Sequence, residues 1–132
     1  MGAAPEVALS VKVAVVDDDP EVREGLKECL EAEGYQVLMV PNGLRLLSVL
    51  MVDRPDLILL DVRMAWIDGL ELCRAIKRNG RYAGIPVVFV SAKVTAEDVD
   101  RGYAAGAADY IKKPFQLEDL LARVRKVAEL RV

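Results

Sequence analysis

The sequence predicts an α/β domain in which a five-stranded parallel sheet is covered by helices. From residue 11 onward, short runs rich in β-branched residues alternate with stretches of helical periodicity, and the alternation occurs five times. Apolar residues make up 53% of the 132 residues. A chain of this length forms one domain that buries about two-thirds of its unfolded surface. We therefore expect one domain over residues 11–132, preceded by a flexible tail at residues 1–10.

The first strand and helix have clear boundary residues. Residues 11–16 form the strand, and Asp19 is suited to be the N-cap of a helix with Pro20 at its first position. Gly34 is suited to end this helix in a left-handed turn, and residues 35–40 form the second strand. The predicted buried side of the helix consists of Val22, Leu26, Cys29 and Leu30.

The second helix is unusually apolar. It covers residues 42–52, because Pro55 prevents helical continuation, and residues 57–60 then form the third strand. Only Arg45 and Ser48 provide a polar stripe. Such a helix is either deeply covered or carries an exposed apolar patch for dimerisation or kinase docking.

The remaining elements follow the same alternation. Asp68 opens a third helix that ends near Gly80, residues 87–90 form the fourth strand, and Thr95 starts a fourth helix with a capping box completed by Asp98. That helix ends at Gly106, residues 109–112 form the fifth strand, and a fifth helix follows Pro114. The expected inner faces are Leu70, Cys73 and Ile76 in the third helix, and Leu117, Leu120, Leu121, Val124, Val127 and Ala128 in the fifth.

Composition excludes several functional classes. There is no histidine, which excludes Ser-His or Cys-His hydrolysis and an internal phosphohistidine relay. Cys29 and Cys73 lack metal-binding or redox spacing and are expected to be plain thiols. A net charge of -3 without a basic stripe argues against direct nucleic-acid binding. No apolar run reaches the roughly 20 residues that span a bilayer, and the N-terminus does not resemble a secretory signal, so we expect a cytoplasmic protein.

Polar residues follow four of the predicted strands. In an open parallel sheet, ligands bind beyond the carboxyl ends of the strands. The residues expected there are Asp17, Asp18, Asp61, Ser91 and Lys113. Taken singly, each has an ordinary structural explanation as a cap, a turn former or a solvated side chain. Together, three carboxylates need a nearby cation, and a hydroxyl and an amine can bind an oxyanion, so the set predicts a Mg²⁺-dependent phosphoryl-transfer pocket.

Four segments resemble response-regulator receiver domains over residues 11 to 130: VAVVDDDPEV, DLILLDVRM followed by IDGLEL, VVFVSAK, and ADYIKKPF. The resemblance implies a flavodoxin-like, doubly wound sheet with strand order 2-1-3-4-5 and helices on both faces. It implies that Asp17 and Asp18 hold Mg²⁺, that Asp61 is the phosphoacceptor, and that the backbone carbonyl of Arg63 also ligates the metal.

The resemblance also assigns a switch. It implies that Ser91 and Lys113 contact the phosphoryl group, that Tyr110 is the aromatic switch residue whose ring turns inward on phosphorylation, and that Lys112 has no role. It further implies a cis peptide bond before Pro114. The side chains of Arg63 and Lys93, two residues after Asp61 and Ser91, would flank the attacking water and influence the lifetime of the phosphorylated form.

The implied function is signalling, with catalysis limited to the chain's own phosphorylation and dephosphorylation. The phosphoryl donor is expected to be an external histidine kinase or phosphotransfer protein. The signal would be read by an effector protein or by an output domain missing from this sequence, through the fourth helix, fifth strand and fifth helix, with a homodimer formed on phosphorylation as a further expectation. Two alternatives stay open: a degenerate receiver that acts only as an interaction module, and a phosphohydrolase of the haloacid-dehalogenase type built on Asp17 and Asp19.

One segment departs from the family pattern. Where the family often has Met-Pro-Gly after the phosphoacceptor, this chain has Met64, Ala65 and Trp66. We therefore expect a loop of different shape. Trp66 either anchors that loop, shields the pocket or contacts a partner.

Overall fold

The computed structural model describes residues 11–130, so the tail expected at residues 1–10 lies outside the described residues. Five parallel strands form one sheet in the order β2-β1-β3-β4-β5. The strands are β1 (Lys12–Val16), β2 (Gln36–Val40), β3 (Leu57–Leu60), β4 (Val87–Ser91) and β5 (Asp109–Lys112). The predicted fold class and strand order are confirmed.

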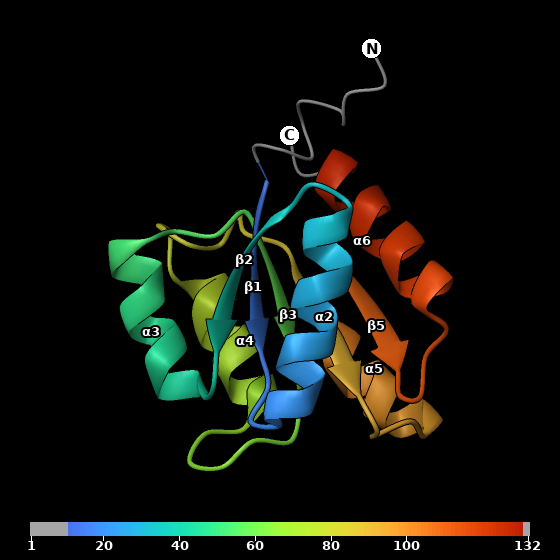
Figure 1. Cartoon of the computed structure of the whole chain (residues 1–132). Helices are drawn as coiled ribbons and strands as arrows, with labels where there is room; N and C mark the ends of the chain where they lie inside the picture. Colours follow the sequence, from blue (N-terminus) through green and yellow to red (C-terminus); the bar gives the residue numbers. More distant parts are fainter. Residues whose placement is uncertain (1–10, 131–132) are drawn as a thin grey trace.

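The five helices cover both faces of this sheet, as Figure 1 shows. They are α2 (Pro20–Ala32), α3 (Gly43–Val52), α4 (Gly69–Arg78), α5 (Ala96–Ala104) and α6 (Leu117–Leu130). Leu26 and Leu30 of α2 share one hydrophobic core with Leu120 and Val124 of α6. The opposite core contains the buried side chains of α3 and α4. The sheet is therefore buried on both sides, as its continuous apolar strands require.

The helix ends form as their sequences predict. Asp19, Asn42 and Asp68 are N-caps whose side chains accept hydrogen bonds from backbone N–H groups of the first turns. Thr95 and Asp98 form the predicted capping box at the start of α5. These caps fix where each helix leaves the carboxyl edge of the sheet.

One predicted inner face is incomplete and another is partly wrong. In α4, Cys73 and Ile76 are buried and Leu70 packs half-buried against the core as predicted, but Leu72, which was not among the expected residues, is fully buried as well. In α6, Leu117 is exposed because it lies in the first turn of the helix, while the later residues Leu120 and Val124 reach the core.

The apolar helix α3 is covered on one side only. Leu46 and Leu50 are fully buried and Val49 is half-buried against the core. Four large apolar side chains on the outer side remain exposed: Leu44, Leu47, Met51 and Val52. The interpretation of α3 as a deeply covered helix is therefore wrong for this outer side.

Among the described residues, no helix combines the length and apolar character needed to cross a membrane.

Candidate functional site

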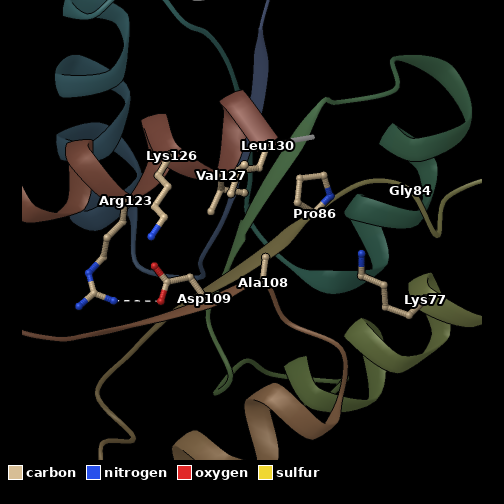
Figure 2. Close-up of a pocket in the computed structure, with 9 residues that line it drawn as sticks. All are labelled: Lys77, Gly84, Pro86, Ala108, Asp109, Arg123, Lys126, Val127 and Leu130. Atoms are coloured by element: carbon tan, nitrogen blue, oxygen red, sulfur yellow. Dashed lines mark hydrogen bonds and ion pairs between the residues drawn. The ribbon is translucent and has the colours of Figure 1, made fainter. Parts of the chain in front are cut away.

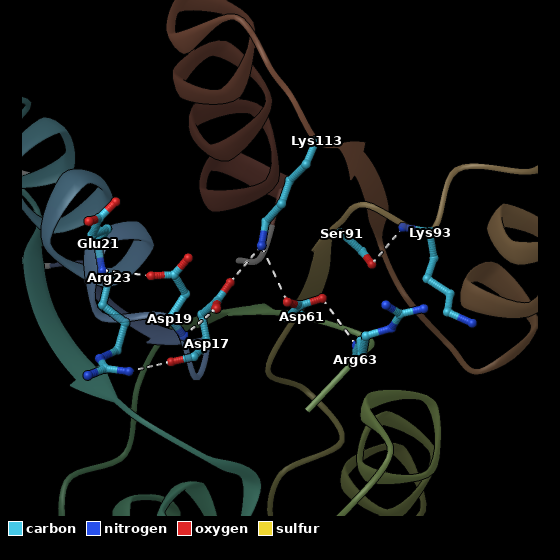
Figure 3. Close-up of polar contacts among 9 residues, drawn as sticks. All are labelled: Asp17, Asp19, Glu21, Arg23, Asp61, Arg63, Ser91, Lys93 and Lys113. Carbon is cyan, nitrogen blue, oxygen red and sulfur yellow. Dashed lines mark hydrogen bonds and ion pairs between the residues drawn. The ribbon is translucent and has the colours of Figure 1, made fainter. Parts of the chain in front are cut away.

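Three predicted site residues meet at the carboxyl edge of the sheet. Asp17 directly follows β1, Asp61 directly follows β3, and Lys113 directly follows β5. Figure 3 shows the two carboxylates converging on the Lys113 amine. The Lys113 Nζ lies 2.8 Å from Asp17 Oδ2 and 3.3 Å from Asp61 Oδ2. The predicted convergence is therefore present for these three side chains.

Both carboxylates are buried and are held by backbone groups. Asp17 is 3% exposed and Asp61 is 9% exposed. Asp17 Oδ1 accepts a hydrogen bond from the backbone N–H of Asp19 at 2.9 Å, and Asp61 Oδ1 accepts one from the backbone N–H of Arg63 at 3.1 Å. Each carboxylate thus has one oxygen fixed by the chain and the other directed at Lys113.

The electrostatic balance of this group leaves negative charge in excess. Burial raises the pKa of the Asp61 carboxyl; Lys113 and the Arg63 N–H oppose that rise, and Asp17 adds to it. Burial lowers the pKa of Lys113, but its hydrogen bond to Asp17 and the charges of Asp61 and Asp17 outweigh burial and bring that pKa above its usual value. The single positive charge of the Lys113 amine, which lies closer to Asp17 than to Asp61, does not fully compensate the negative charges of the two buried carboxylates.

The donor set fits a hard cation. Mg²⁺ is bound in proteins by one or two carboxylates together with waters and phosphate oxygens, and Asp17 and Asp61 supply two carboxylates with uncompensated charge. Asp18 is exposed. Within residues 11–130, no three His, Cys, Asp or Glu side chains are already arranged around one metal position. The structure therefore brings together two of the three predicted carboxylate ligands.

Ser91 and Tyr110 lie on the neighbouring strands β4 and β5. Ser91 is the last residue of β4 and is fully buried, and its Oγ accepts a hydrogen bond from the backbone N–H of Lys93 at 3.1 Å. The Tyr110 ring is also buried, and its hydroxyl donates to the Lys93 carbonyl. Burial raises the pKa of the Tyr110 phenol, which a hydrogen bond with Ser91 counteracts. Both side chains thus meet the segment that follows β4.

A hollow opens beside Asp61. It has a volume of about 360 Å³ and is lined by Asp61, Arg63, Ser91, Ala92, Lys93, Val94, Thr95 and Asp98. The side chains of Arg63 and Lys93 lie on the Ser91 side of Asp61, away from Lys113 (Figure 3). A small oxyanion entering this hollow would therefore meet the Asp61 carboxylate between cationic groups.

Gly69, the first residue of α4, allows this helix to start close to the Asp61 backbone. A Cβ on Gly69 would lie 2.3 Å from the Asp61 carbonyl oxygen and 2.8 Å from Val62 Cα. The Gly69 N–H donates to the Val62 carbonyl at 2.9 Å. The start of α4 therefore packs directly on the phosphoacceptor candidate's main chain, which any other residue at this position would prevent. The Asp-Gly pair at the helix start was the available signal.

The loop between β3 and α4 carries backbone strain at Trp66. Trp66 has φ of 79°, the left-handed region that bulky residues rarely adopt, and it is 86% exposed. It stands where the family often has glycine, which takes this conformation freely. The interpretation of Trp66 as a loop anchor is therefore wrong, because the side chain is not packed into the core. The predicted cis peptide bond between Lys113 and Pro114 is present.

A second hollow lies away from Asp61, at the start of β5, and is shown in Figure 2. It has a volume of about 710 Å³ and includes Lys77, Asp109, Arg123 and Lys126 in its lining. Arg123 is paired with Asp109 at 2.9 Å, and the Lys77 amine donates to the carbonyls of Ala83 and Ile85 at 3.1 and 2.6 Å. These charged groups therefore link elements of the fold to one another.

Comparisons with known proteins find one family over most of the chain. The family model described as "Response regulator receiver domain" matches residues 13–125. The response regulator MprA of Mycobacterium tuberculosis is 43% identical over 117 residues, which cover 89% of this chain and 50% of MprA. The chain thus spans about half the length of the curated relatives it matches.

Solved receiver structures are similar to this chain over most of its length. The chemotaxis response regulator CheY4 of Vibrio cholerae superimposes with a TM-score of 0.83 and 30% identity, covering 89% of this chain and 98% of CheY4. A BeF3-activated DrrB receiver domain superimposes with a TM-score of 0.81 and 34% identity, covering 90% of this chain and 97% of that one.

Proposed function

Because this chain belongs to the response regulator receiver domain family, whose members are signalling modules of two-component systems rather than enzymes, we propose that Asp61 accepts a phosphoryl group. One observation carries the proposal: the Asp61 carboxylate is held by the Arg63 N–H and by Lys113 at the mouth of an open hollow. A buried carboxylate kept in place beside cations is a nucleophile prepared for an electron-poor phosphorus.

The donor in this proposal is a phosphohistidine of a partner kinase or phosphotransfer protein, because the chain has no histidine. An Asp61 carboxylate oxygen attacks the phosphorus, an O–P bond forms, and the P–N bond breaks with its electron pair leaving on the imidazole nitrogen. Later a water oxygen attacks the same phosphorus, the O–P bond to Asp61 breaks, and inorganic phosphate leaves. The chain thus returns to its starting carboxylate.

Lys113 has the clearest role in this reaction. Its amine lies 3.3 Å from Asp61, where it can bind an oxygen of the incoming phosphoryl group. The Arg63 N–H holds the second carboxylate oxygen and so orients the nucleophile. Ser91 lines the same hollow as Asp61, and its hydroxyl would donate to an oxygen of the phosphoryl group.

A magnesium ion, when bound, would neutralise the charge that develops on the phosphoryl oxygens. The residues that would hold it are Asp17, Asp18 and Asp61 through their carboxylates, and Arg63 through its backbone carbonyl. The uncompensated charge of the buried Asp17 and Asp61 pair supports this assignment.

Arg63 and Lys93 are assigned to the lifetime of the phosphorylated form. Both line the hollow in front of Asp61, through which a water must approach the phosphorus. Exchanging these side chains for smaller ones would alter that approach without removing the nucleophile.

The output in this proposal is a change at α5, β5 and α6. The phosphoryl group adds close to two negative charges, draws Ser91 and Lys113 toward Asp61, and biases the position of the Tyr110 ring. A downstream effector, or an output domain in a longer protein, would read that face. Association of two copies on phosphorylation is a further part of the proposal, and the exposed apolar side chains of α3 offer a surface for it.

Intact-mass measurement after incubation with Mg²⁺ and acetyl phosphate tests the central assignment. We expect a gain of one phosphoryl group in the parent and none in Asp61→Asn. The matched control is Asp68→Asn, which removes an exposed carboxylate from the same loop and keeps a side chain able to cap α4. A phosphoryl gain in Asp61→Asn, or none in the parent, would refute the assignment; the second result would favour a degenerate receiver.

A further inference from the structure

Gly102 occupies an unusual place in α5. It lies inside the helix Ala96–Ala104 and is the one buried residue of that helix, all of which is described. Alanine favours a helix interior over glycine by about 1 kcal/mol, so a glycine here works against the helix that contains it. Something other than helix formation must account for it.

The space beside Gly102 is filled by the switch residue. A Cβ on Gly102 would lie 2.6 Å from Tyr110 Cδ2, 2.8 Å from Tyr110 Cε2 and 3.3 Å from Phe89 Cδ2. The first two distances are shorter than any real contact of a Cβ. The Tyr110 ring, 4% exposed and 5.8 Å from the Phe89 ring, therefore occupies the volume that a side chain at position 102 would need.

The ring cannot easily give way within its present position. Its hydroxyl donates to the Lys93 carbonyl, and its backbone is held in β5, where Tyr110 pairs with Phe89 of β4. The Tyr110 carbonyl also accepts a hydrogen bond from Arg123 of α6 at 3.4 Å. With both ends fixed, a Cβ at position 102 would force the ring to rotate out or α5 to move away.

We propose that Gly102 is a positioning residue of the switch: the volume left by its missing side chain admits the Tyr110 ring to the inward position, and a methyl group there holds the ring outside. The steric conflict at position 102 does not depend on phosphorylation, whereas its link to the switch rests on the function proposed for Asp61. A hollow of about 430 Å³ borders Tyr110, so an expelled ring has space beside it.

The chain offers a matched control for the substitution Gly102→Ala. Gly25 lies in the interior of α2, and a Cβ on it would meet nothing within 4 Å. Gly25→Ala therefore has the helix-propensity gain without the steric conflict. Tyr110→Ala removes the ring and so supplies a background in which position 102 has free space.

The first measurement is of ring position and stability in the protein without any phosphoryl group. We expect NMR cross-peaks between the Tyr110 and Phe89 rings in the parent and in Gly25→Ala, and their loss in Gly102→Ala. In urea, Gly102→Ala should lower the unfolding midpoint when Tyr110 is present and raise it in the Tyr110→Ala background. Retained cross-peaks, or the same sign in both backgrounds, would overturn the steric claim, and the double variant keeps the test informative if the single one does not fold.

The second measurement tests whether position 102 is coupled to Asp61. Beryllium fluoride, a phosphoryl analogue, is added together with Mg²⁺, and its binding is followed by the NMR shifts of backbone amides. Coupled sites change one another's affinity reciprocally, so Gly102→Ala should bind the analogue about fivefold or more weakly. In the Tyr110→Ala background, the residue at 102 should change affinity by less than about twofold, whereas a purely structural effect of position 102 would persist there. Equal affinity of the parent and Gly102→Ala for the analogue would refute the link to the switch. If the parent itself does not bind the analogue, the function proposed for Asp61 is refuted. The NMR measurement of the ring position decides the steric claim in either case.

Discussion

Replacing Lys113 by methionine tests the electrostatic account of the site most directly. The substitution keeps the apolar part of the side chain and removes the amine that contacts Asp17 at 2.8 Å and Asp61 at 3.3 Å. Because both oxygens contact the same nitrogen, these two distances limit their separation to about 6 Å. Two unit charges at that distance repel by about 3 kcal/mol at an effective dielectric of 20.

We therefore expect Lys113→Met to lower the free energy of unfolding by about 3 kcal/mol at pH 7 with a chelator present, in line with the loss of one partner from a buried ion pair. Urea unfolding measures this loss. Added Mg²⁺ should restore part of it, since a bound cation replaces the missing charge, and acidification that protonates the carboxylates should remove it. The control is Lys112→Met at the adjacent exposed position, with an expected change within about 0.5 kcal/mol.

Two results would refute this reasoning. A Lys113→Met variant within about 1 kcal/mol of the parent in chelator would show that the two carboxylates do not depend on the amine. A full loss that Mg²⁺ leaves unchanged would show that Asp17 and Asp61 do not bind the cation.

Three further predictions follow from the same region. Burial is the main reason why the pKa of Asp61 is raised in the folded state, so ionisation of Asp61 disfavours the folded state as the pH rises through that pKa. At pH 7, Asp61→Asn should therefore unfold at a higher urea concentration than the parent. This difference should shrink on acidification. Gly69→Ala should lower the free energy of unfolding by more than about 2 kcal/mol, because its Cβ would collide with backbone atoms, whereas Gly84→Ala, with no atom within 4 Å of its Cβ, should leave urea unfolding nearly unchanged. Trp66→Gly should raise the free energy of unfolding, measured by thermal unfolding, by roughly 1 kcal/mol. The substitution relieves backbone strain of about 1–3 kcal/mol, and the greater freedom of glycine in the unfolded chain offsets part of this gain. A lower free energy of unfolding would show that Trp66 makes contacts that outweigh its strain.

Much of the fold was predictable because its signals are local. Caps such as Asp19 and Thr95 satisfy backbone groups within a few residues of themselves, and the apolar strands have the continuous pattern of a doubly covered sheet. The inner face of α4 was harder to predict. Leu70 and Leu72 are equally apolar, and the packing angle of the helix on the sheet decides which one is fully buried.

The sequence predicted which residues belong to the candidate site better than it predicted how they contact one another. Strand-end position alone gathered Asp17, Asp61 and Lys113, because parallel strands end at one edge. The sequence required a cation among the carboxylates, but it did not indicate that the Lys113 amine would itself contact both of them. The role of Gly102 depends on a ring eight residues along the chain, and its one sequence signal was a glycine inside a predicted helix.

The helix α5 has a single buried residue, and this has a consequence for how the protein moves. A helix with one buried residue loses little apolar contact when it detaches, so its opening free energy should be a small fraction of that of the whole domain. Amide hydrogen exchange should accordingly be fastest in α5 and slowest in β1 and β3, which lie in the middle of the sheet. The molecule would then combine a rigid centre, where the carboxylates are held, with a loosely attached edge that can exchange between arrangements while the sheet stays folded.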